Sequence, residues 1–153
     1  MARARLADWA QAAYAAPGVA DLCLALQDEH GQSVCLLLWA AWAGATDRPV
    51  DQLGAASLAR TWEADVVGPL RAARRGLKAA PGLADADRAA LRARVRAGEL
   101  AAEWALLAAL EALAPGSGQA TDPLEAMIAA STAWGVTAPV QRLSKLAAAF
   151  PRG

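Results

Sequence analysis

Alanine outnumbers every other residue in this chain, and the bias favours helices over strands. The 153 residues include 44 alanines and 21 leucines, whereas valine and isoleucine together number nine. Alanine and leucine have high helix propensity, and β-branched residues favour strands. We therefore predict an all-α fold. Because this length suffices for a hydrophobic core, we expect residues 1–153 to form a single helical domain.

The longest apolar run, residues 34–45, predicts a buried helix at the centre of the fold. A helix over residues 34–44 would be apolar almost all round. The run is 12 residues long, shorter than the roughly 20 needed to cross a bilayer, so we expect no membrane association. We predict a compact bundle of about six to seven helices around this central helix. Apolar spacing and breaker residues place the other helices at 6–16, 19–26, 51–80, 85–113, 123–134 and 139–150.

A Gly68-Pro69 pair interrupts the apolar stripe of the helix expected over residues 51–80. Proline lacks a backbone N–H and clashes with the preceding helical turn. The pair therefore predicts a kink or a break at this point.

Charge is unevenly distributed along a chain whose formal net charge is zero. Residues 1–59, 60–96 and 97–153 carry net charges of −3, +5 and −2. At 100° per residue, four basic residues fall on one face of the helix expected over 51–80, and no acid of that helix lies there. These residues are Arg71, Arg74, Arg75 and Lys78, joined by Arg60 if Pro69 does not rotate the helix.

Arginine forks bind carboxylates bidentately, so this basic face predicts a docking surface for an acidic protein partner. The alternative is that these arginines pair within the fold with Asp21, Asp28 or Glu29, or lie in solvent. By contrast, we expect Arg92 and Arg96 to pair with Glu99 along their own helix.

An acidic turn, Asp28-Glu29-His30, is expected after the second helix and holds the only histidine. Cys23 and Cys35 flank it, so the ligand types that zinc prefers are present. Each cysteine also falls on the apolar stripe of its own helix, which predicts buried thiols instead of metal ligands or nucleophiles. We therefore expect no metal site, no catalytic residue and no cofactor. Two unpaired cysteines are typical of a cytoplasmic protein.

Six tryptophans accompany one tyrosine and one phenylalanine. Alanine-rich helices have thin side chains and leave spaces that indole rings fill. We expect most of the tryptophans in the core, with a place in a ligand pocket as the alternative for one or two.

Two segments resemble an uncharacterised family of small proteobacterial proteins. One carries the pattern L-Q-D-x-x-G-x-x-V, from Leu26 to Val34, and the other carries W-x-x-x-V-x-x-P-L-R-x-x-R-R, from Trp62 to Arg75. The resemblance spans roughly residues 6–146. It implies a bacterial, cytoplasmic helical domain, but the family has no assigned activity, so it implies no mechanism.

Two hypotheses about function follow, and they differ in class. The first is a non-enzymatic interaction or adaptor module that uses the basic face. The alternative is a small-molecule-binding protein or enzyme in which the acidic turn faces the arginine cluster across a pocket. Nucleic-acid binding is disfavoured because the net charge is zero and no aromatic residue lies on the basic face.

Overall fold

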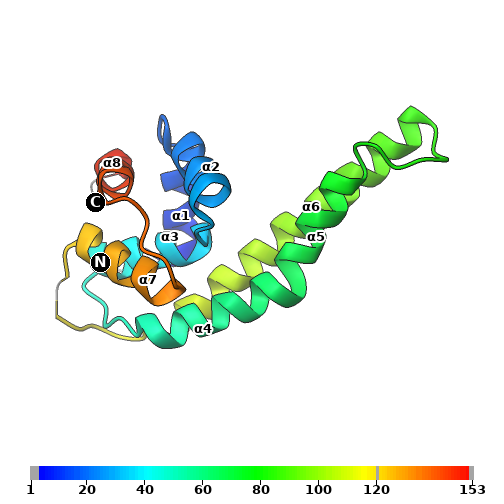
Figure 1. Ribbon diagram of the computed structural model, residues 1–153. Coiled ribbons are helices and arrows are strands. Elements are labelled where there is room, and N and C mark those ends of the chain that lie inside the picture. The colour runs from blue at the N-terminus through cyan, green and yellow to red at the C-terminus, as the bar shows by residue number, and fades with distance from the viewer. Residues whose placement is uncertain (1–3, 120, 152–153) are drawn as a thin grey trace.

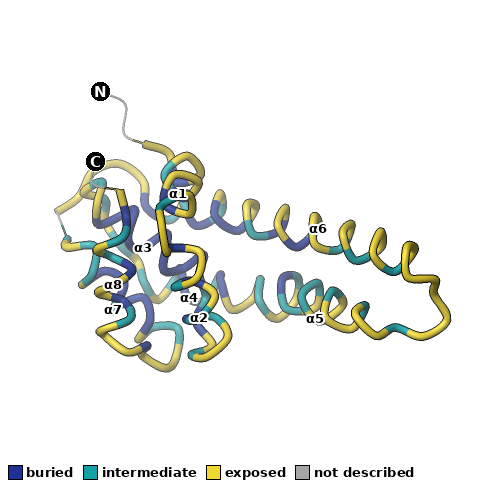
Figure 2. The backbone as a smooth tube through the Cα atoms, turned by 90° about the horizontal axis from the view of Figure 1, so that it is seen from above, coloured by how far each residue is buried: buried dark blue, intermediate teal, exposed yellow. Residues whose placement is uncertain are grey.

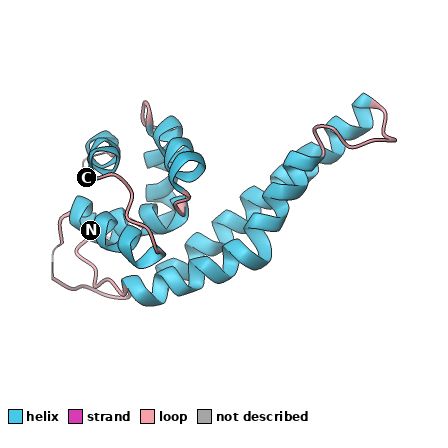
Figure 3. Ribbon diagram, in the orientation of Figure 1, coloured by secondary structure: helices cyan, strands magenta, loops and turns pink. Residues whose placement is uncertain are grey.

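The computed structural model describes residues 4–119 and 121–151, and over these residues it consists of helices joined by loops (Figures 1 and 3). The all-α prediction is confirmed. The elements in chain order are α1 (Leu6–Ala15), α2 (Val19–His30), α3 (Val34–Ala45), α4 (Gln52–Trp62), η1 (Glu63–Val67), α5 (Gly68–Gly76), α6 (Asp85–Glu111), α7 (Pro123–Trp134) and α8 (Val140–Ala149). The element η1 is a π-helix.

Helix α3 lies at the centre of the body of the molecule, as its apolar sequence predicts. Every residue from Cys35 to Gly44 is buried. Ser33 caps the start of the helix, and its hydroxyl accepts a hydrogen bond from the Leu36 amide at 3.3 Å. Trp39 and Trp42 are fully buried within it, which confirms for these two the expected role of indole rings as core filler.

Small residues let α3 pack closely on α7, its main neighbour. A Cβ atom built on Gly44 would lie 2.9 Å from the carbonyl oxygen of Thr121 and 3.0 Å from the Cα of Pro123. On the α7 side, Ala126 and Ala130 are buried. Asp122 caps α7 by accepting hydrogen bonds from the amides of the first turn, as the sequence around it indicates.

Helix α2 runs further than predicted. Instead of forming a turn, Asp28, Glu29 and His30 make up its last helical turn. The helix ends at Gly31, whose φ of 60° is left-handed and whose amide bonds back to the carbonyl of Gln27 at 3.1 Å. The three side chains therefore radiate from a helix and do not converge as a loop would allow.

The elements α4, η1 and α5 follow one another as a continuous rod, and α6 returns alongside it (Figure 1). The end of this hairpin that contains α4 and the second half of α6 packs on the body, while its tip, between α5 and α6, projects away from it (Figure 2). Helix α5 has no buried residue, and α6 has none before Glu99. The predicted bundle thus carries a hairpin whose far half lies outside the common core.

Among the described residues, no helix combines the length and the apolar character needed to cross a membrane. Helix α3 is apolar but short, and α6 is long but charged.

Candidate functional site

A cavity of about 490 Å³ lies where α1, α2 and the start of α3 face the hairpin formed by η1, α5 and α6. We call it the Arg71 cavity. Much of its wall is leucine, valine and alanine, and its charged groups gather on the hairpin side. The principal polar residues that line it are Tyr14, Asp21, Cys23, Gln27, Gln32, Ser33, Cys35, Glu63, Arg71, Arg74, Arg96, Glu99 and Glu103.

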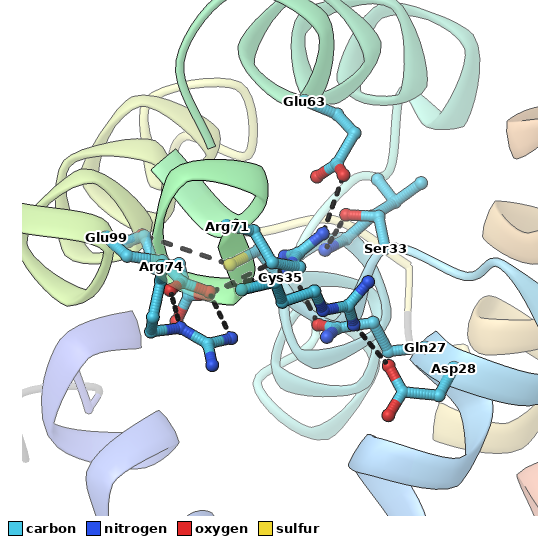
Figure 4. A network of polar contacts seen from close by, with 11 residues as sticks. Gln27, Asp28, Ser33, Cys35, Glu63, Arg71, Arg74 and Glu99 are labelled. Atoms are coloured by element: carbon cyan, nitrogen blue, oxygen red, sulfur yellow. Dashed lines mark hydrogen bonds and ion pairs between the residues drawn. The ribbon is translucent and has the colours of Figure 1, made fainter. Parts of the chain in front are cut away.

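Arg71, on α5, is the hub of the polar network in this cavity (Figure 4). Its Nη1 lies 2.7 Å from Oε1 of Glu63, and its Nε lies 3.4 Å from Oε1 of Glu99. Its Nη2 lies 3.4 Å from Oε1 of Gln27 and 3.9 Å from Oε1 of Glu103. Only 12% of the side chain is exposed. One guanidinium therefore serves three carboxylates from η1 and α6.

Arg74, one turn further along α5, holds the most buried of these carboxylates. Its Nε donates to Oε2 of Glu99 at 2.6 Å and its Nη2 to Oε1 at 3.4 Å, a two-point fork (Figure 4). Burial alone would raise the pKa of Glu99, but the hydrogen bonds and charge of Arg74, followed by those of Arg71, lower it below its ordinary value. Glu99 therefore stays ionised although it is buried.

Glu103, one turn from Glu99 on α6, is in a different position. Burial, followed by the negative charge of Glu99, raises its pKa. Its nearest cation is Arg71 Nη2 at 3.9 Å, beyond hydrogen-bond distance. Its carboxylate thus faces the cavity without a hydrogen-bond donor from the described part of the chain.

Two thiols and a phenol lie opposite the hairpin. Cys23 and Cys35 are buried and free, as predicted. Burial raises the pKa of Cys23 to about 12 and raises that of Cys35 as well. Burial, followed by Cys23, also raises the pKa of Tyr14. All three groups are protonated at neutral pH, so none of them is an activated nucleophile.

The π-helix η1 positions Glu63 and Val67 at the cavity. The amide of Gly68 bonds back five residues to the carbonyl of Glu63. A side chain at Gly68 would not fit, because a Cβ built there overlaps that carbonyl oxygen. Pro69 follows, in the first turn of α5. The predicted interruption at Gly68-Pro69 is thus a widened turn that leaves the rod continuous, and such turns are frequent at functional sites.

The predicted basic face is divided in the structure. Arg71 and Arg74 point into the cavity, and Lys78 is exposed just beyond α5. Arg75 meets Asp28 at 3.3 Å on the surface, beside a second, smaller cavity. The expectation that no acid of the 51–80 helix reaches this face is wrong, because Glu63 pairs with Arg71. Pairing of the arginines within the fold, the alternative, is found for Arg75 with Asp28, and Glu99 of α6 adds a partner that was not predicted.

Two expectations about neighbouring arginines are also wrong. Glu99 faces α5 and binds Arg71 and Arg74, instead of pairing with Arg92 or Arg96. Arg60 does not share the face of Arg71. It donates to the carbonyl oxygens of residues 133 and 134 at the end of α7. The i→i+5 hydrogen bonding of η1 changes the rotation per residue, so a 100° extrapolation from Arg71 does not hold across it.

The other two members of the predicted acidic site turn away from the arginines. Glu29 accepts a hydrogen bond from Arg142 of α8 at 2.9 Å. His30 lies 3.9 Å from Glu29, and its Nε2 is buried without a hydrogen bond. Of the acidic turn, only Asp28 meets an arginine of the predicted cluster. Within the described residues, no group of three or more His, Cys, Asp or Glu side chains is arranged to hold a metal ion.

Sequence reasoning missed Glu63, Glu99, Glu103 and Tyr14 as cavity residues. A usable signal was present, since Glu99 and Glu103 are four residues apart and so share a helix face. Trp104 is the tryptophan that departs from the core, being 38% exposed and lining the cavity.

The cavity is built from the part of the chain that has recognisable relatives. Residues 5–110 match the model of DUF2390, described as a protein of unknown function. The chain belongs to this family. The match to DUF2390 runs from α1 almost to the end of α6 and includes every residue that lines the Arg71 cavity, but it stops short of the expected limit at residue 146. No curated protein and no solved structure matches the chain.

Proposed function

We propose that the chain binds a small, largely apolar molecule in the Arg71 cavity. The observation that carries this proposal is the cavity itself. Its volume of about 490 Å³ falls in the range of small-molecule sites, which are mostly apolar with a few convergent polar groups. The function of the family is unknown, so the proposal rests on geometry alone.

Exposed apolar side chains at the cavity support the same function. Tyr14 and Leu24, from α1 and α2, are 44% and 55% exposed, and Leu100 and Trp104 of α6 are 53% and 38% exposed. All four line the cavity. Apolar residues that gather on both walls of one opening are typical of ligand-binding grooves.

We call the side chains of Glu63, Arg71, Arg74, Glu99 and Glu103 the floor of the cavity. Contacts within the protein hold its arginines in place without a ligand. Arg71 and Arg74 are fixed by carboxylates from two elements, and Glu99 is buried between them. Such a network costs a ligand little ordering entropy. Like the alternative hypothesis from the sequence, this proposal is for a small-molecule-binding protein. The acidic residues of the site differ: Glu63, Glu99 and Glu103 take the place of Glu29 and His30.

Binding of an uncharged dye tests this function. N-phenyl-1-naphthylamine fluoresces in apolar surroundings, and we expect its fluorescence to rise saturably with the protein. The double variant Leu24→Asn/Leu100→Asn should weaken binding about tenfold, or about 1.4 kcal/mol. The matched control is Leu53→Asn/Val136→Asn, because these residues are 73% and 74% exposed and lie outside the cavity. Absence of saturable binding, or equal losses in both variants, would refute the proposal.

An acidic protein partner is a second candidate, at a surface that keeps only Lys78 of the predicted basic face. Within the described residues, Lys78 and three arginines of the projecting hairpin (Arg92, Arg94 and Arg96) form no ion pair. Retention on immobilised poly-L-glutamate tests this candidate. We expect Arg94→Glu to elute at lower salt than Lys145→Glu, an identical charge change on α8. Equal elution would remove the hairpin as a docking surface.

We also propose a location in the bacterial cytoplasm. The two free, buried thiols support it, since disulfides are rare in that compartment. Cell fractionation with a tagged chain tests it, and recovery in the periplasm would contradict it.

A further inference from the structure

The charges that line the Arg71 cavity do not balance. Four carboxylates (Asp21, Glu63, Glu99 and Glu103) and three guanidiniums (Arg71, Arg74 and Arg96) belong to its wall. At the outer part of the wall, Asp21 of α2 and Arg96 of α6 are exposed and opposite in sign. The positive charge of Arg96 also acts on Glu103, but it lowers the pKa of that carboxyl less than burial and Glu99 raise it. On the floor, three glutamates share two arginines. The floor therefore carries one negative charge more than it carries positive charge.

The carboxylate without a cation of its own is that of Glu103. Arg74 is committed to Glu99 through two hydrogen bonds, and Arg71 has its shortest contact, at 2.7 Å, with Glu63. Glu103 is left 3.9 Å from Arg71, with 31% of its side chain exposed. A carboxylate that is partly desolvated and lacks a hydrogen-bond donor is unfavourable, and burial already raises its pKa.

We propose that the ligand of the Arg71 cavity is an amphipathic amine, whose protonated amino group binds the Glu103 carboxylate and whose apolar body packs on Leu100 and Trp104. This inference rests on the proposed function and specifies its ligand class. An ammonium group supplies both the positive charge and the N–H donors that Glu103 lacks.

The surroundings of Glu103 suit an ammonium on an apolar body. Leu100 and Trp104 lie on the same helix, within one turn of Glu103, and both line the cavity. Tyr14 and Trp104 contribute aromatic rings, and ring faces attract cations. An anionic ligand fits the floor poorly, because it would have to displace a glutamate from Arg71 or Arg74.

The test uses three six-carbon ligands with different head groups, and hexanol is the matched reference for hexylamine because hexanoate has one apolar carbon fewer. Hexylamine, hexanol and hexanoate compete with N-phenyl-1-naphthylamine at pH 7. We expect hexylamine to displace the dye at a concentration about tenfold lower than the other two, the effect of one charge-assisted hydrogen bond. In Glu103→Gln this preference should fall to within about twofold, while the dye still binds.

The matched control is Glu111→Gln, which removes one negative charge from the same helix. Glu111 lies two turns from Glu103, outside the cavity and 3.7 Å from Arg5. This variant should keep the amine preference, because the effect is local.

The outcomes separate the two proposals. If the dye binds but the three competitors act equally, or if hexanoate is preferred, the amine inference fails and the cavity function stands. An amine preference that survives Glu103→Gln also overturns the inference. If the dye does not bind at all, the proposed function fails and the inference fails with it.

Discussion

The paired arginines of α5 differ sharply in burial, and this difference predicts how much each pair stabilises the fold. Arg74 and Glu99 are 14% and 9% exposed, whereas Arg75 and Asp28 are 56% and 43% exposed. Removing one partner of a buried pair leaves an uncompensated charge and typically costs about 3–5 kcal/mol. Breaking an exposed pair costs about 0–1 kcal/mol.

Glu99→Gln tests the buried pair because the substitution keeps the size of the side chain and removes its charge. We expect a loss of about 3 kcal/mol in the free energy of unfolding, at the lower end because the amide oxygen still accepts one hydrogen bond and because Glu103 is no longer repelled by the Glu99 charge. For a chain of this length, that corresponds to a fall of about 6–12 °C in Tm. Arg75→Gln, the matched control, should cost no more than about 1 kcal/mol. Urea unfolding followed by circular dichroism measures both.

The same substitution carries a pH signature. The pKa of Glu99 is lowered in the folded protein from its usual 4.5, so its contribution is fully present above that value and disappears as pH falls through the folded-state pKa. The difference in free energy of unfolding between the native chain and Glu99→Gln should therefore become smaller only below about pH 4.5. A cost at pH 7 no larger than that of Arg75→Gln would refute the assignment of a stabilising buried pair.

Three further predictions test the cavity and its supports. Gly68→Ala should destabilise the fold by about 1–3 kcal/mol, because the new Cβ overlaps the Glu63 carbonyl, whereas in a regular α-helix it would stabilise by about 1 kcal/mol; urea unfolding decides the sign. Glu103→Gln should raise Tm at pH 7, because the raised pKa of Glu103 shows that the fold disfavours its charged form. This increase in Tm should vanish below the usual pKa of 4.5, and a lower Tm at pH 7 would contradict the prediction. Cys23 and Cys35 should react with iodoacetamide at pH 8 far more slowly in the folded chain than in urea, and equal rates by mass spectrometry would show that the thiols are accessible.

Features set by local chemistry were predictable from the sequence. The apolar run gives α3 its central place, Asp122 starts α7, and Gly31 ends a helix. The fate of Cys23 and Cys35 was predictable for the same reason, since the stripe that contains each thiol also buries it.

The partners of charged residues were not predictable, because they depend on how helices meet. Nothing near Arg74 in the chain indicates that Glu99, 25 residues later, will return beside it. The Gly68-Pro69 pair marked an interruption, but a break, a kink and a widened turn differ only in backbone hydrogen bonding. Consequently the orientation of Arg60 relative to Arg71 could not be extrapolated across it.

The sparse burial of the hairpin tip has a consequence for how the molecule opens. Amide hydrogens of α3 sit in the core and should exchange only through global unfolding, on the slowest timescale of the chain. Between Glu99 and the tip, helices α5 and α6 have no buried residue, so they should separate from the tip inward at a much lower free energy. Starting from the tip, the separation first meets the hydrogen bonds from Arg88 to the Ala80 carbonyl, and within the described residues the Arg74–Glu99 fork is the ion pair between α5 and α6 nearest the tip. This ion pair should therefore stop local opening of the hairpin before the opening reaches the floor of the cavity.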